Sequence, residues 1–476
     1  MKLPPPIPPL RRRRRRPQAR PAPGLALVLR AASAFATLAV AATLAACGGP
    51  FRPQPPKGVL VVLVDALRAD QLQLYGSQRA IAPGLDALGA ESIVFDRAFS
   101  PGSWTRPSLP SLLTGLYPSE HGLTDFVGSA GQYKGAVLPE SAATLAEGMQ
   151  AAGYRTAMVG YQTLLSARFG LAQGFDFYNN NTNGAERIGK RFLEWFDQAP
   201  DKPFFAYLHY LDIHWPYCPP ASTYGRFDPT PNDVITCDDW RGLRERIRSG
   251  ALVLTAADRR ALAARYSEEM AALDVHLAEL FAELRARGVW DDLLLVVTAD
   301  HGEELAERGG IEHGHTMYDE LLHVPYVWKL PKSWGAARGR HESGLVESRT
   351  LTPTLLDVAG QPPPAGVSAI SLLPWLAPRP KPEAPAAYVV AESNGIFAVR
   401  TSTHKLIVTP AEKKLELYDL VADPAERHDL APGRPPELAE LQGLLRKWRA
   451  GLRPIATGST TLDEKTTEDL KALGYL

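Results

Sequence analysis

The chain has 476 residues, of which 45% are hydrophobic, and it contains 52 basic and 52 acidic side chains. This length and apolar content favour a folded protein with a large core and two subdomains, and they exclude a disordered chain. Nine basic residues and no acidic residue lie in the first 46 positions, so the remainder carries a net charge of −9. A negative charge of this size argues against nucleic acid as a partner.

Residues 1–46 are typical of an export signal, because a basic stretch precedes the short apolar run 31–46, which ends in small residues. That run of 16 residues is short for a permanent membrane span. The sequence LAAC, which ends at Cys47, resembles the lipobox of bacterial lipoproteins, where the cysteine is lipidated. We expect an exported protein of the bacterial cell envelope, anchored in the membrane by a lipid on Cys47, with residues 47–57 as a tether. An ordinary signal peptide or an uncleaved anchor is the alternative.

Residues 58–373 alternate between predicted strands and helices. Continuous apolar runs, typical of strands buried on both faces, are found at 59–64, 156–159, 203–208, 293–297 and 324–330. Helical stretches are found at 141–152, 185–196 and 256–287. The alternation predicts an α/β fold with a mainly parallel central sheet and helices on both faces.

The sequence pattern changes in residues 374–476, which begin with a proline-rich stretch. Four short strand-like segments follow, AYVVAE, IFAVRT, HKLIV and LELYDL, and then a helical stretch at 436–452. These segments predict a smaller C-terminal α+β subdomain with an antiparallel sheet.

Two predicted strands end on residues that bind hard cations. Asp65 follows the first strand, and Asp300 and His301 follow the strand at 293–297. Ligands of open α/β sheets bind beyond the carboxyl ends of the strands, so these side chains are candidates for a metal site. Helix capping is the alternative for each aspartate taken alone. Further histidines in polar loops, at 209, 214, 313 and 315, favour either a metal site or an anion-binding pocket that transfers protons.

Thr105 lies in WTRPSLPSLLTG, at the predicted first turn of a short apolar helix. Its hydroxyl could cap the helix by accepting a bond from a free backbone N–H. It could also be a nucleophile, because the same N–H groups and the helix dipole stabilise an anion at that position.

Cys218 and Cys237 lie in a proline-rich loop. In an oxidising compartment they could form one local disulfide, and two free thiols are the alternative.

An ordered set of motifs resembles the sulfatase family of the alkaline phosphatase superfamily. The motifs run from residue 58 to residue 476, and they are VDALRAD, SWTRPSLPSLLTGLYPSEHG, GYRTAMVG, GFDFY, HYLDIHWPY, VVTADHGEE, EHGHTMYDELLHVPYV, LYDLVADPAERHDLA and LKALGYL. The resemblance implies hydrolysis of a sulfate or phosphate ester, in a small molecule, a glycan or a lipid. It also implies one divalent metal ion, and we expect calcium, which many sulfatases bind, with manganese or zinc, which relatives bind, as the alternatives.

The resemblance implies a role for individual residues. The metal ligands are Asp65, Asp300 and His301, and Thr105 occupies the nucleophile position, with Arg106 beside it among the substrate-binding residues. His214 contacts the substrate oxyanion or donates a proton. Of the two histidines in EHGH, one fills a position where many members have a lysine; we assign His315 to catalysis and His313 to substrate binding.

The sequence departs from the family pattern at the nucleophile. Sulfatases convert a cysteine or serine, in a motif that ends in arginine, to formylglycine, whereas this chain has Thr105 and Leu109 at those positions. A formylglycine hydrate expels sulfate by returning to the aldehyde, but a threonine ester must be cleared by water, which phosphoryl esters tolerate better. Ala66 also stands where many members have a second metal-binding aspartate.

Tyr161 and Thr163 look like the pair found in relatives that hydrolyse phosphonate monoesters and phosphodiesters, and ordinary loop residues are the alternative. Three functions therefore remain open: an extracytoplasmic hydrolase of sulfate or phosphate esters, a transferase that passes a phospho group to envelope polymers, and a surface binding protein whose catalysis has been lost.

Overall fold

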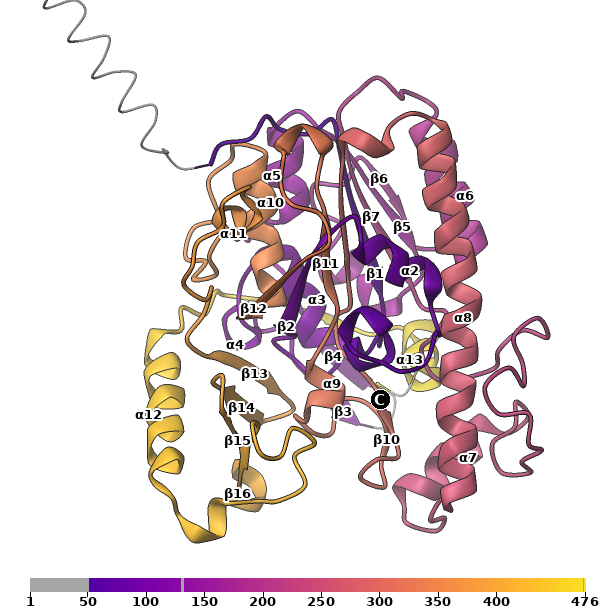
Figure 1. Ribbon diagram of the computed structural model, residues 1–476. Helices are drawn as coiled ribbons and strands as arrows, with labels where there is room; N and C mark the ends of the chain where they lie inside the picture. Colours follow the sequence, from indigo (N-terminus) through magenta and orange to yellow (C-terminus); the bar gives the residue numbers. More distant parts are fainter. Residues whose placement is uncertain (1–50, 130–131, 474) are drawn as a thin grey trace, which may run out of the picture. The chain divides into compact units, whose positions relative to one another are not determined.

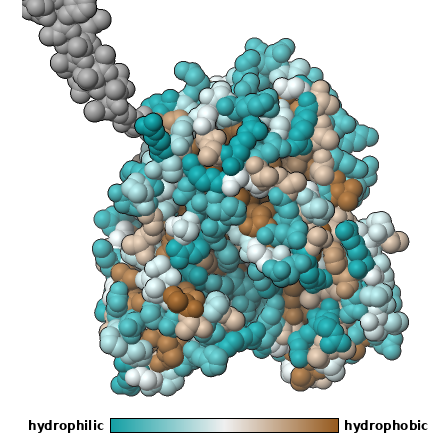
Figure 2. Space-filling model, in the orientation of Figure 1, coloured by the Kyte–Doolittle hydropathy of each residue, from teal (hydrophilic) through white to brown (hydrophobic). Residues whose placement is uncertain are grey.

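The computed structural model describes residues 51–129, 132–473 and 475–476. The predicted signal segment and Cys47 lie outside the described residues. The part from Arg52 to Leu476 forms one compact unit. Hydrophilic residues cover most of the face of this unit that Figure 2 shows. None of the helices in the described ranges has both the length and the apolar character needed to cross a bilayer.

An eight-stranded sheet forms the centre of this unit (Figure 1). All its strands are parallel except β11, which is antiparallel to both of its neighbours. The predicted mainly parallel α/β fold is thus confirmed. The strand order is β12 (Arg340–Glu347), β2 (Ile93–Phe99), β11 (Tyr326–Lys329), β8 (Leu293–Thr298), β1 (Gly58–Val64), β7 (Phe204–Tyr210), β5 (Arg155–Gly160) and β6 (Phe177–Asn179).

Helices cover both faces of this sheet, and each layer is a set of helices in mutual contact (Figure 1). One layer consists of α2 (Pro83–Gly89), α6 (Ala185–Phe196) and α8 (Ala256–Ala286), and the other of α3 (Thr105–Thr114), α5 (Leu145–Ala151) and α10 (Leu351–Val358). The long helix α8 begins at a capping box, in which the Thr255 side chain accepts from the Asp258 N–H and the Asp258 carboxylate accepts from the Thr255 N–H. The shorter helices are α4 (Pro118–His121), α7 (Trp240–Arg248), α9 (Asp319–Leu322) and α11 (Leu373–Leu376).

The predicted C-terminal antiparallel sheet has four strands, β13 (Val389–Ser393), β14 (Ile396–Arg400), β15 (His404–Thr409) and β16 (Lys414–Asp419). Helix α12 (Pro436–Gly451) packs on it through Leu441, Leu445 and Trp448. A two-residue ladder, β9 (Glu304–Leu305) with β10 (Ile311–Glu312), lies outside both sheets.

The chain after α12 does not stay with this small sheet. Strand β17 (Gly458–Thr461) pairs with β4 (Gln132–Val137), which in turn pairs with β3 (Phe126–Ser129). Helix α13 (Glu464–Ala472) then packs against the short helix η3 (Thr163–Leu165) of the large domain. The last residues therefore return to the carboxyl end of β5, because an apolar cluster that includes Leu462 and Leu470 holds them there.

Candidate active site

The strand register places the two candidate aspartates next to each other. In adjacent parallel strands, Leu63 of β1 is paired with Thr298 of β8 and with His209 of β7. Asp65 lies two residues after Leu63, and Asp300 lies two residues after Thr298. The Asp65 N–H continues the ladder by donating to the Tyr210 carbonyl at 2.9 Å. The carboxyl ends of β1, β7 and β8 therefore converge on one point.

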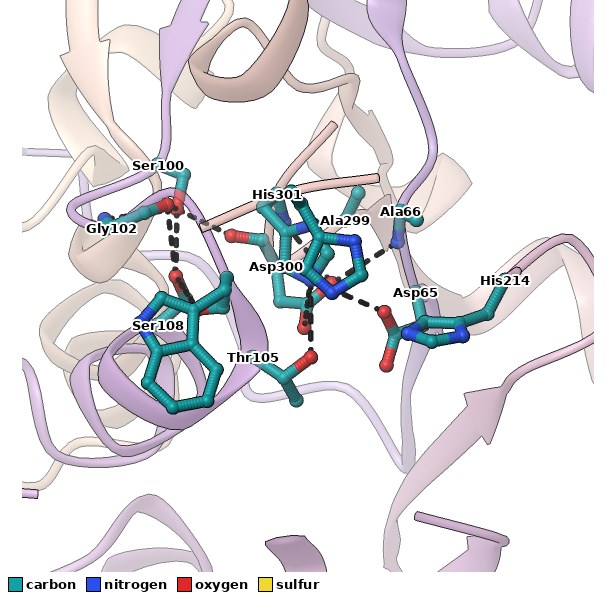
Figure 3. Close-up of polar contacts among 12 residues, drawn as sticks. Asp65, Ala66, Ser100, Gly102, Thr105, Ser108, His214, Ala299, Asp300 and His301 are labelled. Carbon is teal, nitrogen blue, oxygen red and sulfur yellow. Dashed lines mark hydrogen bonds and ion pairs between the residues drawn. The ribbon is translucent and has the colours of Figure 1, made fainter. Parts of the chain in front are cut away.

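Asp65, Asp300 and His301 form a group that could hold a metal ion (Figure 3). One ligand atom from each residue lies within 4.8 Å of the other two, and all three side chains are fully buried. Among the described residues, Asp65 Oδ1 and Asp300 Oδ2 have no hydrogen-bond partner. Two buried carboxylate oxygens without a donor are costly unless a cation neutralises them, so these residues fit a divalent ion.

The orientation of His301 also suits a ligand. Its Nδ1 lies 2.7 Å from the Gly302 carbonyl, and a carbonyl can only accept, so Nδ1 carries the proton. In the neutral ring the lone pair is then on Nε2, which faces Asp65 Oδ1 at 3.3 Å and Asp300 Oδ2 at 3.4 Å. The hydrogen bond from His301 Nδ1 to the Gly302 carbonyl is the usual way in which a protein orients a histidine that binds a metal through its other ring nitrogen.

The charges of this group are strongly coupled. Burial raises the pKa of Asp300 to about 6, and the neighbouring charge of Asp65 adds to the rise. Burial also disfavours the Asp65 carboxylate, but the adjacent imidazoles of His209, His301 and His214 outweigh it and hold the pKa of Asp65 well below its usual value. Burial lowers the pKa of His301, but the two carboxylates more than compensate and raise it to about 9. The group therefore attracts positive charge, as a cation site must.

Thr105 is the first residue of α3, and the helix cap is Trp104, so the threonine hydroxyl is not the cap. Instead Thr105 Oγ1 lies 3.1 Å from His301 Nε2 and points toward the carboxylates (Figure 3). The side chain is fully buried. Of the two interpretations that the sequence left open, this position favours the nucleophile.

His214 and the penultimate residue, Tyr475, lie next to Thr105. Tyr475 OH lies 2.8 Å from Thr105 Oγ1 and 3.2 Å from His214 Nε2. His214 Nδ1 donates to the Trp215 carbonyl at 2.8 Å, so its Nε2 is the nitrogen available to the site. The sequence analysis had named His214 but not Tyr475, because nothing in a terminal LGYL indicates where the chain end folds.

Between Tyr161 and Thr163 the structure brings the intervening residue, Gln162, into the site. Gln162 Nε2 donates to Asp65 Oδ2 at 2.8 Å and lies 3.3 Å from Tyr475 OH. In the described part of the chain, no hydrogen bond or ion pair is made by the side chains of Tyr161 and Thr163, and their role in substrate binding stays a prediction. Alternation of side chains at a strand end turns Gln162 inward when its neighbours point elsewhere.

His209 is another residue of the centre that was seen in the sequence only as a loop histidine. It is the sixth residue of β7, and its Nε2 lies 3.2 Å from Asp65 Oδ2, the oxygen that Gln162 also contacts. Asp65 therefore has one oxygen fixed by two side chains, which leaves Oδ1 for a cation.

The two histidines of the EHGH segment lie in different places. Gly314, with a φ of +84° that glycine adopts at little cost, turns the chain between them. The ring of His313 lies 4.3 Å from His301 and 5.0 Å from His214, and its Nδ1 lies 2.9 Å from Glu303 Oε1. His315 instead pairs with Glu304 at 2.7 Å. The structure thus brings His313, which was expected to bind substrate, next to His301 and His214, and it pairs His315, which was expected to be catalytic, with Glu304.

Arg106 does not join the site. Its guanidinium lies over the rings of Phe126 and Phe169 and donates to the Ala136 carbonyl at 3.0 Å. Burial lowers its pKa to about 10. The residue supports the start of α3, and the expectation that it binds substrate is not supported.

Cys218 and Cys237 are free thiols, so the structure does not contain the predicted disulfide. Burial, together with a hydrogen bond to Cys237, raises the pKa of Cys218 to about 12. Trp240 Nε1 donates to Cys218 Sγ at 2.8 Å.

A pocket of about 400 Å³ leads toward the centre from the surface. It is lined by aromatic residues, by both EHGH histidines and by the ion pair of Arg248 with Glu312. Its position between the large domain and the chain end makes it the candidate substrate pocket.

Comparisons with known proteins agree with this geometry. A family model described as "Sulfatase" matches residues 57–361, and one described as "N-sulphoglucosamine sulphohydrolase, C-terminal" matches residues 310–449. An N-acetylglucosamine-6-O-sulfatase of Bacteroides thetaiotaomicron is 25% identical over an alignment that covers 82% of this chain and 85% of that protein.

Two solved structures show the same fold. A protein in complex with its substrate D-glucosamine-2-N,6-O-disulfate matches with a TM-score of 0.69 and 21% identity, over 84% of this chain and 98% of the other. A phosphonate monoester hydrolase from Silicibacter pomeroyi matches with a TM-score of 0.67 and 23% identity, over 83% and 94% of the two chains.

Proposed function

We propose that this chain, which belongs to the sulfatase family, is a metal-dependent hydrolase of sulfate esters that uses Thr105 as its nucleophile. The observation that carries the proposal is the position of the Thr105 hydroxyl, 3.1 Å from His301 Nε2 and beside two buried carboxylates that have oxygens without donors. A buried threonine with only a packing role would not need an imidazole and two carboxylates around its hydroxyl.

Asp65, Asp300 and His301 would hold one divalent cation, which when bound supplies positive charge to the nucleophile oxygen and to the transferred group. A donor set of two carboxylates and one imidazole favours manganese or zinc over calcium, because calcium takes roughly six to eight oxygen ligands. His209 and Gln162 both contact Asp65 Oδ2, and these contacts fix the orientation of Oδ1, the oxygen that would bind the cation.

The Thr105 hydroxyl gives its proton to water, Oγ1 attacks the sulfur atom, the bond from sulfur to the alcohol oxygen breaks, and a threonine sulfate ester forms. The first turn of α3 stabilises negative charge on this oxygen through its dipole. His214 Nε2 gives a proton to the departing alcohol. The His313 ring lies beside His214, and the contact of its Nδ1 with Glu303 fixes its orientation. Water then attacks the ester and restores the Thr105 hydroxyl.

The test is the turnover of 4-nitrophenyl sulfate by Thr105→Val, which keeps the shape of threonine without its hydroxyl. We expect a loss of about a thousandfold or more in kcat, the size typical of a removed nucleophile or oxyanion contact. Thr114→Val is the matched control, because Thr114 is a buried threonine of the same helix whose hydroxyl donates to the Pro110 carbonyl and accepts from the Leu116 N–H. Equal activity of Thr105→Val and wild type would reject the proposal.

Hydrolysis of a phosphate ester or a phosphonate monoester, or transfer of the phospho group to a second alcohol, is the second candidate. The observation in its favour is the threonine itself, since water clears a phosphoryl ester of threonine more readily than a sulfate ester. Comparison of kcat/KM for aryl sulfate, aryl phosphate, aryl phosphonate and phosphodiester substrates separates the candidates.

The basic and apolar N-terminal segment and LAAC at Cys47 support export and lipid anchoring in a bacterial envelope. Metabolic labelling with palmitate tests this part of the proposal, and we expect label in the wild-type protein and none in Cys47→Ala.

A further inference from the structure

Tyr475 fills the space between the two residues that would act on a substrate. Its hydroxyl lies 2.8 Å from Thr105 Oγ1, 3.2 Å from His214 Nε2 and 3.3 Å from Gln162 Nε2. A single phenol oxygen is therefore within hydrogen-bond distance of the nucleophile and of the proton donor.

The same residue forms the inner wall of the candidate substrate pocket. Tyr475 and Trp104 line this pocket of about 400 Å³, and their ring centroids are 5.5 Å apart. Thr105 lies behind them with no exposed surface. A substrate in the pocket thus meets the phenol ring before it can reach the threonine.

The atom that Thr105 attacks must come into contact with Oγ1, and the departing oxygen must face His214. Both positions lie within reach of the Tyr475 hydroxyl, so substrate and phenol exclude each other. We infer that Tyr475 is an access gate, which occupies the substrate position in this conformation and must leave it before an ester can bind. The inference rests on the proposed function for the roles of Thr105 and His214.

The attachment of the chain end fits a gate that opens without loss of the fold. Helix α13 is anchored by the fully buried Leu470 and by the ion pair of Arg168 with Asp463. The Tyr475 side chain, which is not fully buried, is held by its hydroxyl contacts and by packing against the apolar cluster that includes Trp104 and Leu470. The rings of His214 and His313 each lie 6.0 Å away. When the Tyr475 side chain moves away, the space between these rings suits a substrate that contains a ring.

The experiment compares wild type with Tyr475→Ala, Tyr475→Phe and a deletion of residues 475–476, and it uses two readouts. The first is the dissociation constant of inorganic sulfate, measured by calorimetry on the metal-loaded protein. The second is KM and kcat for 4-nitrophenyl sulfate. Lys465→Ala, an exposed position of α13, is the control for the helix.

A gate lowers the apparent affinity by the fraction of molecules in which it is open. We therefore expect Tyr475→Ala and the deletion to bind sulfate about tenfold more tightly and to have a correspondingly lower KM, with kcat unchanged or raised. Tyr475→Phe should show a smaller gain, because it keeps the ring and loses only the hydroxyl contacts.

Two results would overturn the gate. One is an unchanged or weaker sulfate affinity in both Tyr475→Ala and the deletion. The other is a fall in kcat in Tyr475→Ala and Tyr475→Phe at constant KM, which would make Tyr475 a positioning residue that assists the reaction. Tighter sulfate binding in proteins that hydrolyse no ester would support the gate and reject the proposed hydrolysis.

Discussion

Gln162 Nε2 donates to Asp65 Oδ2 at 2.8 Å, so an amide at the end of β5 fixes a carboxylate at the end of β1. Loss of a hydrogen bond to a metal-binding side chain typically weakens the metal affinity by a factor of about 10 to 100. We expect Gln162→Leu to weaken metal binding by about that factor, measured by titration calorimetry.

The neighbours of Gln162 are the matched controls. Tyr161→Phe and Thr163→Val should leave the metal affinity unchanged, since their side chains do not contact Asp65 in the structure. A loss in either control equal to that of Gln162→Leu would contradict the assignment.

Metal binding should stabilise the fold through Asp65, Asp300 and His301. At a free metal concentration of a hundred times the dissociation constant, linkage adds roughly 2.7 kcal/mol to the free energy of unfolding. Thermal melts with and without manganese or zinc should show this gain in the wild type and lose it in Asp65→Asn and Asp300→Asn. Asp201→Asn, at an exposed position, should keep it, and a full gain in Asp300→Asn would remove that residue from the ligand set.

The two EHGH histidines should differ in their effect on turnover. His313 adjoins His301 and His214, whereas His315 is paired with Glu304 in the outer pocket. We expect His313→Asn to lower kcat by about a hundredfold or more and His315→Asn by less than about tenfold, in steady-state kinetics with an aryl sulfate. The opposite order would restore the role that the sequence analysis assigned to His315.

Stability at acid pH should depend on His121, which is fully buried in α4. Burial lowers its pKa from an ordinary value of 6.5 to about 3. Its Nδ1 accepts from the Leu123 N–H at 3.0 Å, and a proton on that nitrogen would break the bond. Between pH 6.5 and pH 3 the unfolded chain therefore binds a proton that the folded protein excludes. The free energy of unfolding falls as the pH falls through this window, by up to about 1.4 kcal/mol per pH unit from this group.

Denaturant unfolding at pH 6, 5 and 4 checks this prediction through its slope. His121→Gln should lose stability less steeply than the wild type, whatever its stability at pH 7. His428→Gln is the control, because the His428 side chain is 83% exposed. A slope in His121→Gln as steep as that of the wild type would show that His121 does not cause the acid sensitivity.

The local pattern predicted the strands and helices that are buried or amphipathic along their whole length. Helix α6 was expected at 185–196 and is found there, and β1 and β8 were expected from their continuous apolar runs. Strands β2 and β12 were not anticipated. Strand β12 alternates between partly buried and exposed residues in its first half and includes a break in register.

The sequence also indicated the candidate metal-binding group, because Asp65, Asp300 and His301 follow apolar strands and the ends of neighbouring parallel strands lie close together. Only the tertiary structure decided which further side chains join them. Gln162 enters through the direction of one side chain at a strand end, and Tyr475 enters because β17 and α13 carry the chain end back to the large domain. Contacts between residues more than 300 positions apart depend on packing and long-range strand pairing, which leave no local signal in the sequence.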